Sequence, residues 1–171
     1  MRGTVILRDM IKSNYGKYLF YFILFLIIFL LDRISKIYIL NIANNEELYI
    51  YINDFLNIIL IWNTGIGFGL LSFSDNFIYN SITFLILLIN FILIYLALQS
   101  HNLRRILYIV ILGGSFGNLF DRFYYSAVPD FIDINFNGYH WFVFNVADIF
   151  ISIGITCLIF MEILDYRNQN K

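Results

Sequence analysis

Four segments of this chain are long and apolar enough to cross a lipid bilayer, and they limit the folds open to it. They span about 18–40, 77–98, 106–125 and 141–161. About 20 apolar residues in a helix cover the hydrocarbon layer of a membrane. Because 60% of the 171 residues are hydrophobic and only 13% are charged, one soluble core could not bury them all. The sequence therefore predicts an all-α polytopic membrane protein with four transmembrane helices.

The chain shows no repeat, low-complexity tract or linker, so we expect residues 1–171 to form a single integral membrane domain. The first apolar segment is not expected to be a cleaved signal peptide, because no small-x-small site follows it and LDRISK (31–36) continues the helix. Cys157, the only cysteine, lies in an apolar run and is expected to be a small buried residue. The formal net charge of −1, with no basic patch, gives no reason to expect a nucleic-acid partner.

Outside the apolar segments, basic residues gather at both ends of the chain and in the short loop 99–105. They are Arg2, Arg8, Lys12, Lys17, Arg104, Arg105, Arg167 and Lys171. Loop 41–76, by contrast, contains no Lys or Arg. Because cytoplasmic loops carry an excess of Lys and Arg, we predict that both termini are cytoplasmic and that loops 41–76 and 126–140 face outward.

The first outer loop contains LYIYINDFLNIILIW (48–62), a pattern typical of a β-hairpin. Its two runs of Ile and Tyr are separated by Asn53 and Asp54, and both faces are apolar. We expect this hairpin to lie on the membrane surface or against the helices, as a small extramembrane hairpin or sheet cradle on the outer side. The segment NTGIGFG (63–69) then supplies three glycines, which suit tight turns and close backbone approach.

Charged and amide side chains within the helical segments gather at one depth, near the outer ends of three helices. Residues three or four apart share a helix face, so Asp32 and Lys36 can pair with each other. Each charge would cost several kcal/mol facing lipid, so we expect the group to face inward or to line a wet cleft. Its members are Asp32, Lys36, Asn118, Asp121, Arg122, Asn145 and Asp148.

Carboxylates in this layer outnumber the cations that can neutralise them. Lys36 and Arg122 can pair with two carboxylates, and Arg33 can supply a third cation. Asp148 has no basic residue within reach on its own helix, and Asp130 lies at the edge of the same layer. Two carboxyls at low dielectric tend to share a proton, and such a pair can activate water against an amide and protonate the leaving nitrogen. These residues therefore favour an aspartic hydrolase.

Two other classes of protein are compatible with parts of this pattern. A small proton-coupled carrier or channel would also hold Asp and Asn within helices, although its charges should spread through the membrane. A structural subunit would explain the helices and a structural Asp32–Arg33–Lys36 ion-pair set, but not an unpaired Asp148. A metal site is not expected, because His101 and His140 have no His, Cys or carboxylate at ligand spacing.

Five sequence blocks together resemble the signature motifs of the lipoprotein signal peptidase (signal peptidase II) family. They are DRISK (32–36), NTGIGFG (63–69), GGSFGNLFDR (113–122), VPDF (128–131) and FNVAD (144–148). The blocks extend over essentially the whole chain apart from its tails. The resemblance implies an intramembrane aspartic endopeptidase of the bacterial inner membrane. Such an enzyme removes the signal peptide of a diacylglyceryl-modified prolipoprotein just before the lipidated cysteine.

The resemblance also implies roles for individual residues. Asp130 and Asp148 match the catalytic pair, while Asp121 is a reserve candidate because it lies on a predicted helix and Asp130 on a loop. The matching supporting residues are Asp32, Lys36, Asn63, Gly114, Asn118, Asp121, Arg122 and Asn145. We expect no cofactor and no metal. The expected partners are lipidated prolipoprotein signal peptides and membrane lipids, with a monomeric enzyme whose active site lies near the periplasmic face.

Contacts within the site can also be predicted. Asn118 and Asn145 are expected to orient the two catalytic carboxyls. An ion pair between Asp121 and Arg122 is expected to brace the third helix. We further expect the hairpin and segment 63–69 to form a cradle and an edge over the acyl chains of the substrate.

Overall fold

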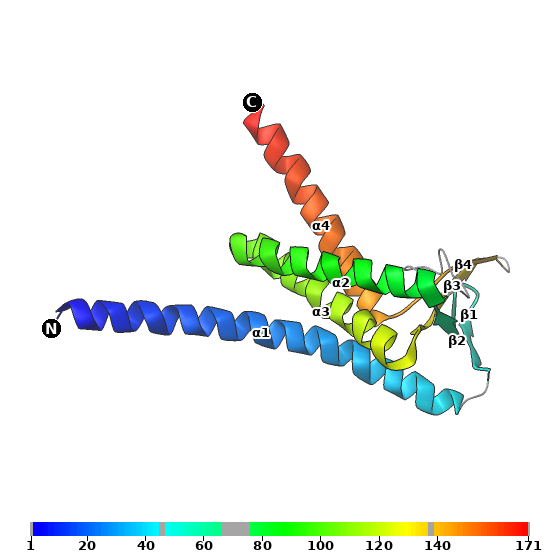
Figure 1. Cartoon of the computed structure of the whole chain (residues 1–171). Helices are drawn as coiled ribbons and strands as arrows, with labels where there is room; N and C mark the ends of the chain where they lie inside the picture. Colours follow the sequence, from blue (N-terminus) through cyan, green and yellow to red (C-terminus); the bar gives the residue numbers. More distant parts are fainter. Residues whose placement is uncertain (1, 45–46, 66–75, 137–138, 171) are drawn as a thin grey trace.

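The computed structural model describes residues 2–44, 47–65, 76–136 and 139–170, and it contains four helices and one sheet (Figure 1). The helices are α1 (Arg2–Ala43), α2 (Asn76–Gln99), α3 (Asn102–Tyr125) and α4 (Val146–Gln169). The strands are β1 (Tyr49–Asn53), β2 (Leu56–Asn63), β3 (Val128–Phe136) and β4 (Tyr139–Phe144). The sheet lies at one end of the helices, as Figure 1 shows, so the predicted fold class is confirmed.

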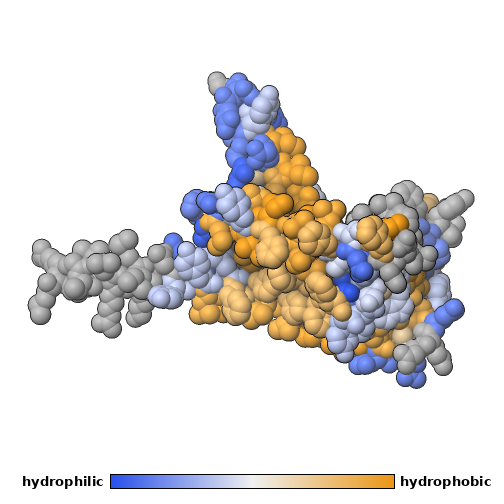
Figure 2. Space-filling model, in the orientation of Figure 1, coloured by the Kyte–Doolittle hydropathy of each residue, from blue (hydrophilic) through white to orange (hydrophobic). Residues whose placement is uncertain are grey.

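The helices expose apolar side chains over most of their length. Among the described residues, three helical segments are long and apolar enough to cross a membrane: Phe77–Gln99, Asn102–Tyr125 and Val146–Gln169. The 42-residue helix α1 also exposes many large apolar side chains between Tyr18 and Tyr38. Figure 2 shows an apolar belt that continues across neighbouring helices, with hydrophilic surface toward their ends. Such a belt is the surface that a protein presents to lipid.

Several helix boundaries differ from the sequence-based prediction, including the starts of α1 and α4. Helix α1 begins at Arg2, so the basic N-terminal tail continues the first apolar segment as one helix. The predicted fourth helix, 141–161, starts too early, because Tyr139–Phe144 forms β4 and α4 begins at Val146. Aromatic and β-branched residues in YHWFVF favour a strand, and Asn145 then caps α4 in a capping box with Asp148. Asn145 therefore lies just before α4, and Asp148 lies in its first turn.

Both outer loops contribute to one antiparallel sheet with the strand order β1-β2-β3-β4. The predicted hairpin 48–62 is confirmed as β1 and β2, and its turn is closed by a hydrogen bond from the Phe55 N–H to Asn53 Oδ1 at 2.9 Å. Residues 126–140 were predicted to be a loop, but most of them are strand. Asp130 pairs with Ile61 of β2 and so lies on a hydrogen-bonded strand.

Helix α3 occupies the centre of the bundle and packs against α1, α2 and α4. Glycines on α3 allow the backbones to approach closely. A Cβ at Gly113 would lie 2.8 Å from Ile28 Cβ on α1, and a Cβ at Gly114 would lie 2.6 Å from the Ala147 carbonyl oxygen on α4. These contacts bring the polar outer ends of α1, α3 and α4 together.

Helix α4 buries only a narrow stripe, made of Ala147, Asp148 and Gly154. Cys157 lies outside this stripe and is exposed, so the prediction that it is buried is wrong. An apolar run does not reveal which of its faces meets the bundle and which meets lipid. At the far end of α4, the side chain of the half-buried Arg104 pairs with the exposed carboxylates of Glu162 at 3.0 Å and Asp165 at 2.5 Å.

Substituting Gly113 by Ala should lower the melting temperature of the protein in detergent. The added Cβ would overlap the rigid Cβ of Ile28, and overpacking of this kind costs about 1–3 kcal/mol. Gly16→Ala is the matched control. Gly16 lies in helix α1, and nothing lies within 4 Å of a Cβ added there. Alanine favours helix over glycine, so this control should be neutral or stabilising. Equal melting temperatures for Gly113→Ala and the wild type would contradict the packing argument.

Candidate active site

Two cations and two carboxylates from α1 and α3 form a buried set, which we call the ion-pair quartet. Lys36 Nζ lies 2.9 Å from Asp32 Oδ1 and 2.6 Å from Asp121 Oδ2. Arg33 closes the set, with Nη2 3.0 Å from Asp32 Oδ2 and Nη1 2.5 Å from Asp121 Oδ1. The quartet has no net charge, which makes its burial tolerable. The predicted pairing of Asp32 with Lys36 is confirmed. Arg33, predicted only as a possible third cation, pairs with both carboxylates.

Asp121 and Arg122 do not form the predicted pair. They are adjacent on α3, and neighbouring helical residues project in different directions. Arg122 Nη2 instead donates to the Gly65 carbonyl, and its guanidinium lies 5.7 Å from the centre of the Tyr79 ring. The Tyr79 hydroxyl in turn donates to the Arg122 carbonyl at 2.8 Å. Arg122 therefore joins α3 to α2 and to the backbone that follows β2.

Asp130 lies on β3, is only 2% exposed, and is held by two amide side chains. Asn63 Nδ2 donates to Asp130 Oδ2 at 2.8 Å, and Asn145 Nδ2 donates to Asp130 Oδ1 at 2.6 Å. Burial, and next the negative charge of Asp148, raise the pKa of Asp130 to about 7. The two amide donors favour the ionised form and act in the opposite direction. Asp130 can therefore exchange a proton near neutral pH.

Asp148 lies in the first turn of α4 and contacts the same asparagine. Its Oδ2 accepts a hydrogen bond from the Asn145 N–H at 3.2 Å, while the Asp148 N–H donates to Asn145 Oδ1 at 3.2 Å. Asp148 Oδ1 also accepts from Asn118 Nδ2 at 2.8 Å. The Asn145 side chain thus touches both aspartates, and Asn118 holds one of them, as expected from the sequence.

Two hydrogen bonds connect the ion-pair quartet to the aspartates. Lys36 Nζ donates to Asn118 Oδ1 at 2.7 Å, and the Ala147 N–H at the start of α4 donates to Asp32 Oδ1 at 3.0 Å. A carboxylate at a helix N-terminus is favoured by the helix dipole. A Cβ at Gly117 would lie 2.4 Å from Asp32 Oδ2, so this position needs glycine. Sequence reasoning missed Gly117, although it lies inside the GGSFGNLFDR block.

Within the described part of the chain, Asp130 and Asp148 take part in no ion pair, whereas Asp32 and Asp121 each pair with two cations. This agrees with the sequence-based prediction of at least one carboxylate without a cationic partner. The site therefore combines two buried carboxyls, linked through Asn145, with neutral hydrogen-bond donors. This is the equipment of acid–base catalysis by a carboxyl pair.

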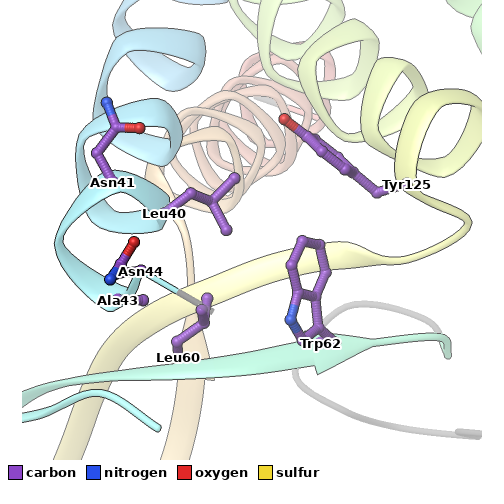
Figure 3. A pocket seen from close by; sticks show the side chains of 7 residues that line it. All are labelled: Leu40, Asn41, Ala43, Asn44, Leu60, Trp62 and Tyr125. Atoms are coloured by element: carbon purple, nitrogen blue, oxygen red, sulfur yellow. The ribbon is translucent and has the colours of Figure 1, made fainter. Parts of the chain in front are cut away.

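A cavity of about 570 Å³ lies between the outer end of α1, β2 and the end of α3 (Figure 3). Figure 3 shows the Trp62 ring pointing toward Tyr125. The centres of the two rings lie 5.4 Å apart. The cavity mixes apolar and uncharged polar groups, and its size lies in the range of small-molecule sites. Its lining residues are Leu40, Asn41, Ala43, Asn44, Leu60, Trp62 and Tyr125.

His140 is not isolated, contrary to the sequence-based interpretation. Its Nδ1 lies 2.8 Å from Oδ2 of the buried Asp133. The pairing of β3 with β4 brings these side chains together, which their spacing in the sequence does not indicate. Among the described residues, no group of three or more His, Cys, Asp or Glu could hold a metal ion. Residues 66–69 of the glycine-rich block lie outside the described residues, so the predicted edge over the acyl chains is not described.

A family model for signal peptidase (SPase) II matches residues 24–164 of this chain. The chain belongs to the signal peptidase II family. The lipoprotein signal peptidase of Pelagibacter ubique (strain HTCC1062) is 51% identical over 161 residues, which are 94% of this chain and 96% of that protein. The lipoprotein signal peptidase of Anaplasma phagocytophilum (strain HZ) is 36% identical over 80% of this chain and 87% of its own length.

The structure is also similar to that of a bacterial membrane enzyme determined by the in meso method at 2.3 Å resolution. The two have a TM-score of 0.70 and 28% sequence identity over 86% of this chain and 90% of the other. Family membership confirms the predicted function and enzyme class. The chain is an aspartic peptidase of the bacterial membrane, a lipoprotein signal peptidase that cleaves signal peptides from prolipoproteins. This finding decides against the carrier and the structural subunit.

Replacing Lys36 by Met should strongly destabilise the enzyme. The change leaves the carboxylates of Asp32 and Asp121 buried with one cation fewer, and breaking a buried ion pair costs about 3–5 kcal/mol. Arg104→Met is the control, because its partners Glu162 and Asp165 are exposed and solvent screens their charges. Thermal unfolding of both variants in the same detergent checks the prediction. A Lys36→Met melting temperature as high as that of the control would contradict it.

Proposed function

We propose that Asp130 and Asp148 are the catalytic pair, and that the enzyme cuts diacylglyceryl-modified prolipoproteins just before the lipidated cysteine. The observation that carries the proposal is two buried carboxyls that touch one asparagine, neither in an ion pair among the described residues. The reserve candidate Asp121 is bound by both Lys36 and Arg33. Its charge is neutralised inside the quartet, so it is poorly suited to exchanging protons.

In the proposed mechanism the pair holds one proton at neutral pH. The ionised carboxyl removes a proton from water as the water oxygen adds to the scissile carbonyl carbon. The protonated carboxyl donates its proton to the carbonyl oxygen, which gives a neutral tetrahedral diol. When the C–N bond breaks, a carboxyl returns a proton to the leaving amine. The two groups titrate as a unit, so the mechanism assigns these roles to the pair and needs no cofactor.

The supporting residues divide into two groups by what they contact. Asn63, Asn118 and Asn145 donate hydrogen bonds to the catalytic carboxyls and orient them without neutralising them. The others hold the helices and loops in place around the pair. Asp32, Lys36 and Asp121 belong to the ion-pair quartet, Gly114 lets α3 approach α4, and Arg122 holds the Gly65 carbonyl.

We further propose that the active site lies near the periplasmic face of the inner membrane, with both chain termini in the cytoplasm. Basic residues lie at the start of α3 (Arg104 and Arg105) and in the last turn of α4 (Arg167), the helix ends opposite those that carry the site. The positive-inside rule assigns such basic ends to the cytoplasmic side. A cysteine whose acyl chains are anchored in the outer leaflet presents its peptide bond at the depth of Asp130 and Asp148. Membrane lipids then surround the apolar belt.

The cavity beside Trp62 has the uncharged, partly polar lining that the glycerol and ester groups of such a substrate need. One chain supplies both aspartates and every supporting side chain, so a monomer with a single integral membrane domain, residues 1–171, is sufficient for activity.

Asp130→Asn and Asp148→Asn should each lower kcat for a lipidated precursor by about 10²–10⁴-fold, because each removes one member of the acid–base pair. Asp133→Asn is the matched control: it changes a buried aspartate on the same strand, three residues beyond Asp130. Purified variants are compared by following the precursor and product on a gel. Cleavage by either catalytic variant at the rate of the control would refute the assignment. Activity lost on adding EDTA would point to a metal instead.

The value of kcat/KM should fall as the pH rises through about 7. Asp130 has a raised pKa, so its protonated form dominates below that value and is lost above it. The Asn63 amide favours the ionised form, so Asn63→Ala should raise the pKa and move the alkaline limb upward by about one pH unit. Asn80→Ala, on the exposed surface of α2, should leave the profile in place. An unchanged limb in Asn63→Ala would show that the titration does not involve the pair that contains Asp130.

A further inference from the structure

An apolar groove of about 270 Å³ lies between α1, α2 and α3, toward the helix ends that are far from the sheet, and we call it the inner groove. Helices α1 and α2 each pack against α3 but make few contacts with each other, which leaves space between them. Phe25 of α1, Ile94 of α2 and Phe116 of α3 line its walls. Arg105 is the one charged residue among the described lining residues.

The inner groove extends over the depth of one lipid leaflet. Arg105 lies in the first turn of α3, and Phe116 follows it roughly 16 Å further along the helix. The hydrocarbon core of a bilayer is about 30 Å thick, so one leaflet accounts for about 15 Å. Tyr18 and Tyr21 line the same end as Arg105, and tyrosine rings are typical of the membrane–water interface. The groove therefore matches a lipid molecule in length, whereas a membrane-spanning peptide would extend well beyond it.

Arg105 places a positive charge at the interfacial end of the inner groove. Its Nε donates to the Ala97 and Ser100 carbonyls at 3.0 and 2.7 Å, and its Nη2 donates to the Leu98 carbonyl at 3.2 Å. The Tyr21 ring lies 5.5 Å from the guanidinium carbon. All of these partners are neutral, and Arg105 takes part in no ion pair among the described residues. The contacts therefore hold the guanidinium in place without neutralising its charge.

The charges around the inner groove select between a lipid and a signal peptide as its occupant. Arg104, the neighbour of Arg105, pairs with two carboxylates and does not line the groove. Lys17, which precedes Tyr18 on α1, is exposed and has no acidic partner in the part of the chain that the structure describes. This end of the groove thus carries excess positive charge. It attracts an anionic headgroup and repels the basic n-region of a signal peptide.

We propose that the inner groove binds one anionic phospholipid of the cytoplasmic leaflet, with its phosphate at Arg105 and an acyl chain against Phe25, Ile94 and Phe116. Basic pockets between transmembrane helices on the cytoplasmic side are typical sites for anionic headgroups. The bound lipid fills the space between α1 and α2 and so stabilises the inner end of the bundle.

The choice of leaflet rests on the proposed orientation of the chain. Binding in detergent depends neither on that orientation nor on the catalytic pair. Failure of this proposal and failure of the proposed function are therefore separate outcomes.

The first test measures the melting temperature of the purified full-length enzyme in detergent with added lipid. A ligand at about five times its Kd should raise the melting temperature of a chain of this size by about 2–4 °C. We expect this shift with phosphatidylglycerol and a smaller one with phosphatidylcholine of the same acyl chains. Glycerol 3-phosphate, which has no acyl chains, should cause none.

Two results of this first test would overturn the proposal. Equal shifts with the two lipids would mean that the groove binds acyl chains without recognising the anionic headgroup. A shift with glycerol 3-phosphate alone would mean that the site takes a free phosphate and not a lipid.

The second test removes the positive charge. Arg105→Gln should weaken the apparent affinity for phosphatidylglycerol about five-fold, the contribution of one basic residue near an anionic headgroup. Arg104→Gln is the matched control, because it removes the same charge from the adjacent position but does not alter the groove. Equal losses in both variants would mean a general attraction to this end of the protein, and no loss in Arg105→Gln would mean that the headgroup lies elsewhere. Either result would overturn the proposal.

The third test fills the inner groove without changing any charge, so it remains decisive even if Arg105→Gln does not fold. Ile94→Trp places a larger side chain in the groove and should abolish the shift caused by phosphatidylglycerol. Ile92→Trp is the control on the same helix, because Ile92 is 57% exposed and does not line the groove. It should keep the full shift. A shift that persists in Ile94→Trp, or that is lost equally in both variants, would refute lipid binding in this groove.

Discussion

The ion-pair quartet of Asp32, Arg33, Lys36 and Asp121 is the interaction on which the remaining site depends. Four charges at the buried outer ends of α1 and α3 neutralise one another, so the helices can approach in a low-dielectric environment. The quartet also holds α4, because Asp32 accepts the Ala147 N–H at the start of that helix. By occupying Arg33 and Lys36, it leaves the proposed catalytic carboxyls to uncharged partners.

Those uncharged partners are asparagines, and their chemistry suits the proposed reaction. An Arg or Lys in direct contact would hold a carboxyl ionised and remove it from proton exchange near neutral pH. The amides of Asn63 and Asn145 hold Asp130 in place while burial and the charge of Asp148 keep its pKa at about 7. Asn145 contributes twice, because it caps α4 and touches both aspartates. A helix start and an acid–base pair therefore share one residue.

The sheet at one end of the helices contributes directly to the candidate active site. Strand β3 carries Asp130, and its pairing with β2 places Asn63 against Asp130. The proposed catalysis thus depends on the strand register. Because a shift of one residue turns every side chain to the opposite face, this register must be maintained for Asn63 to reach Asp130.

The sequence by itself determined the membrane class, the outer depth of the polar residues, the hairpin 48–62 and the family blocks that include Asp130 and Asp148. These features are local, since they follow from hydropathy, from spacing along one helix and from short motifs. Only the tertiary structure decided that Asp121 pairs with Lys36 and Arg33 and not with Arg122, and that Cys157 faces outward. It also decided that Asp130 lies on a paired strand and that His140 meets Asp133. Each of these depends on which distant segment packs alongside, and periodicity along the chain carries no information about that choice.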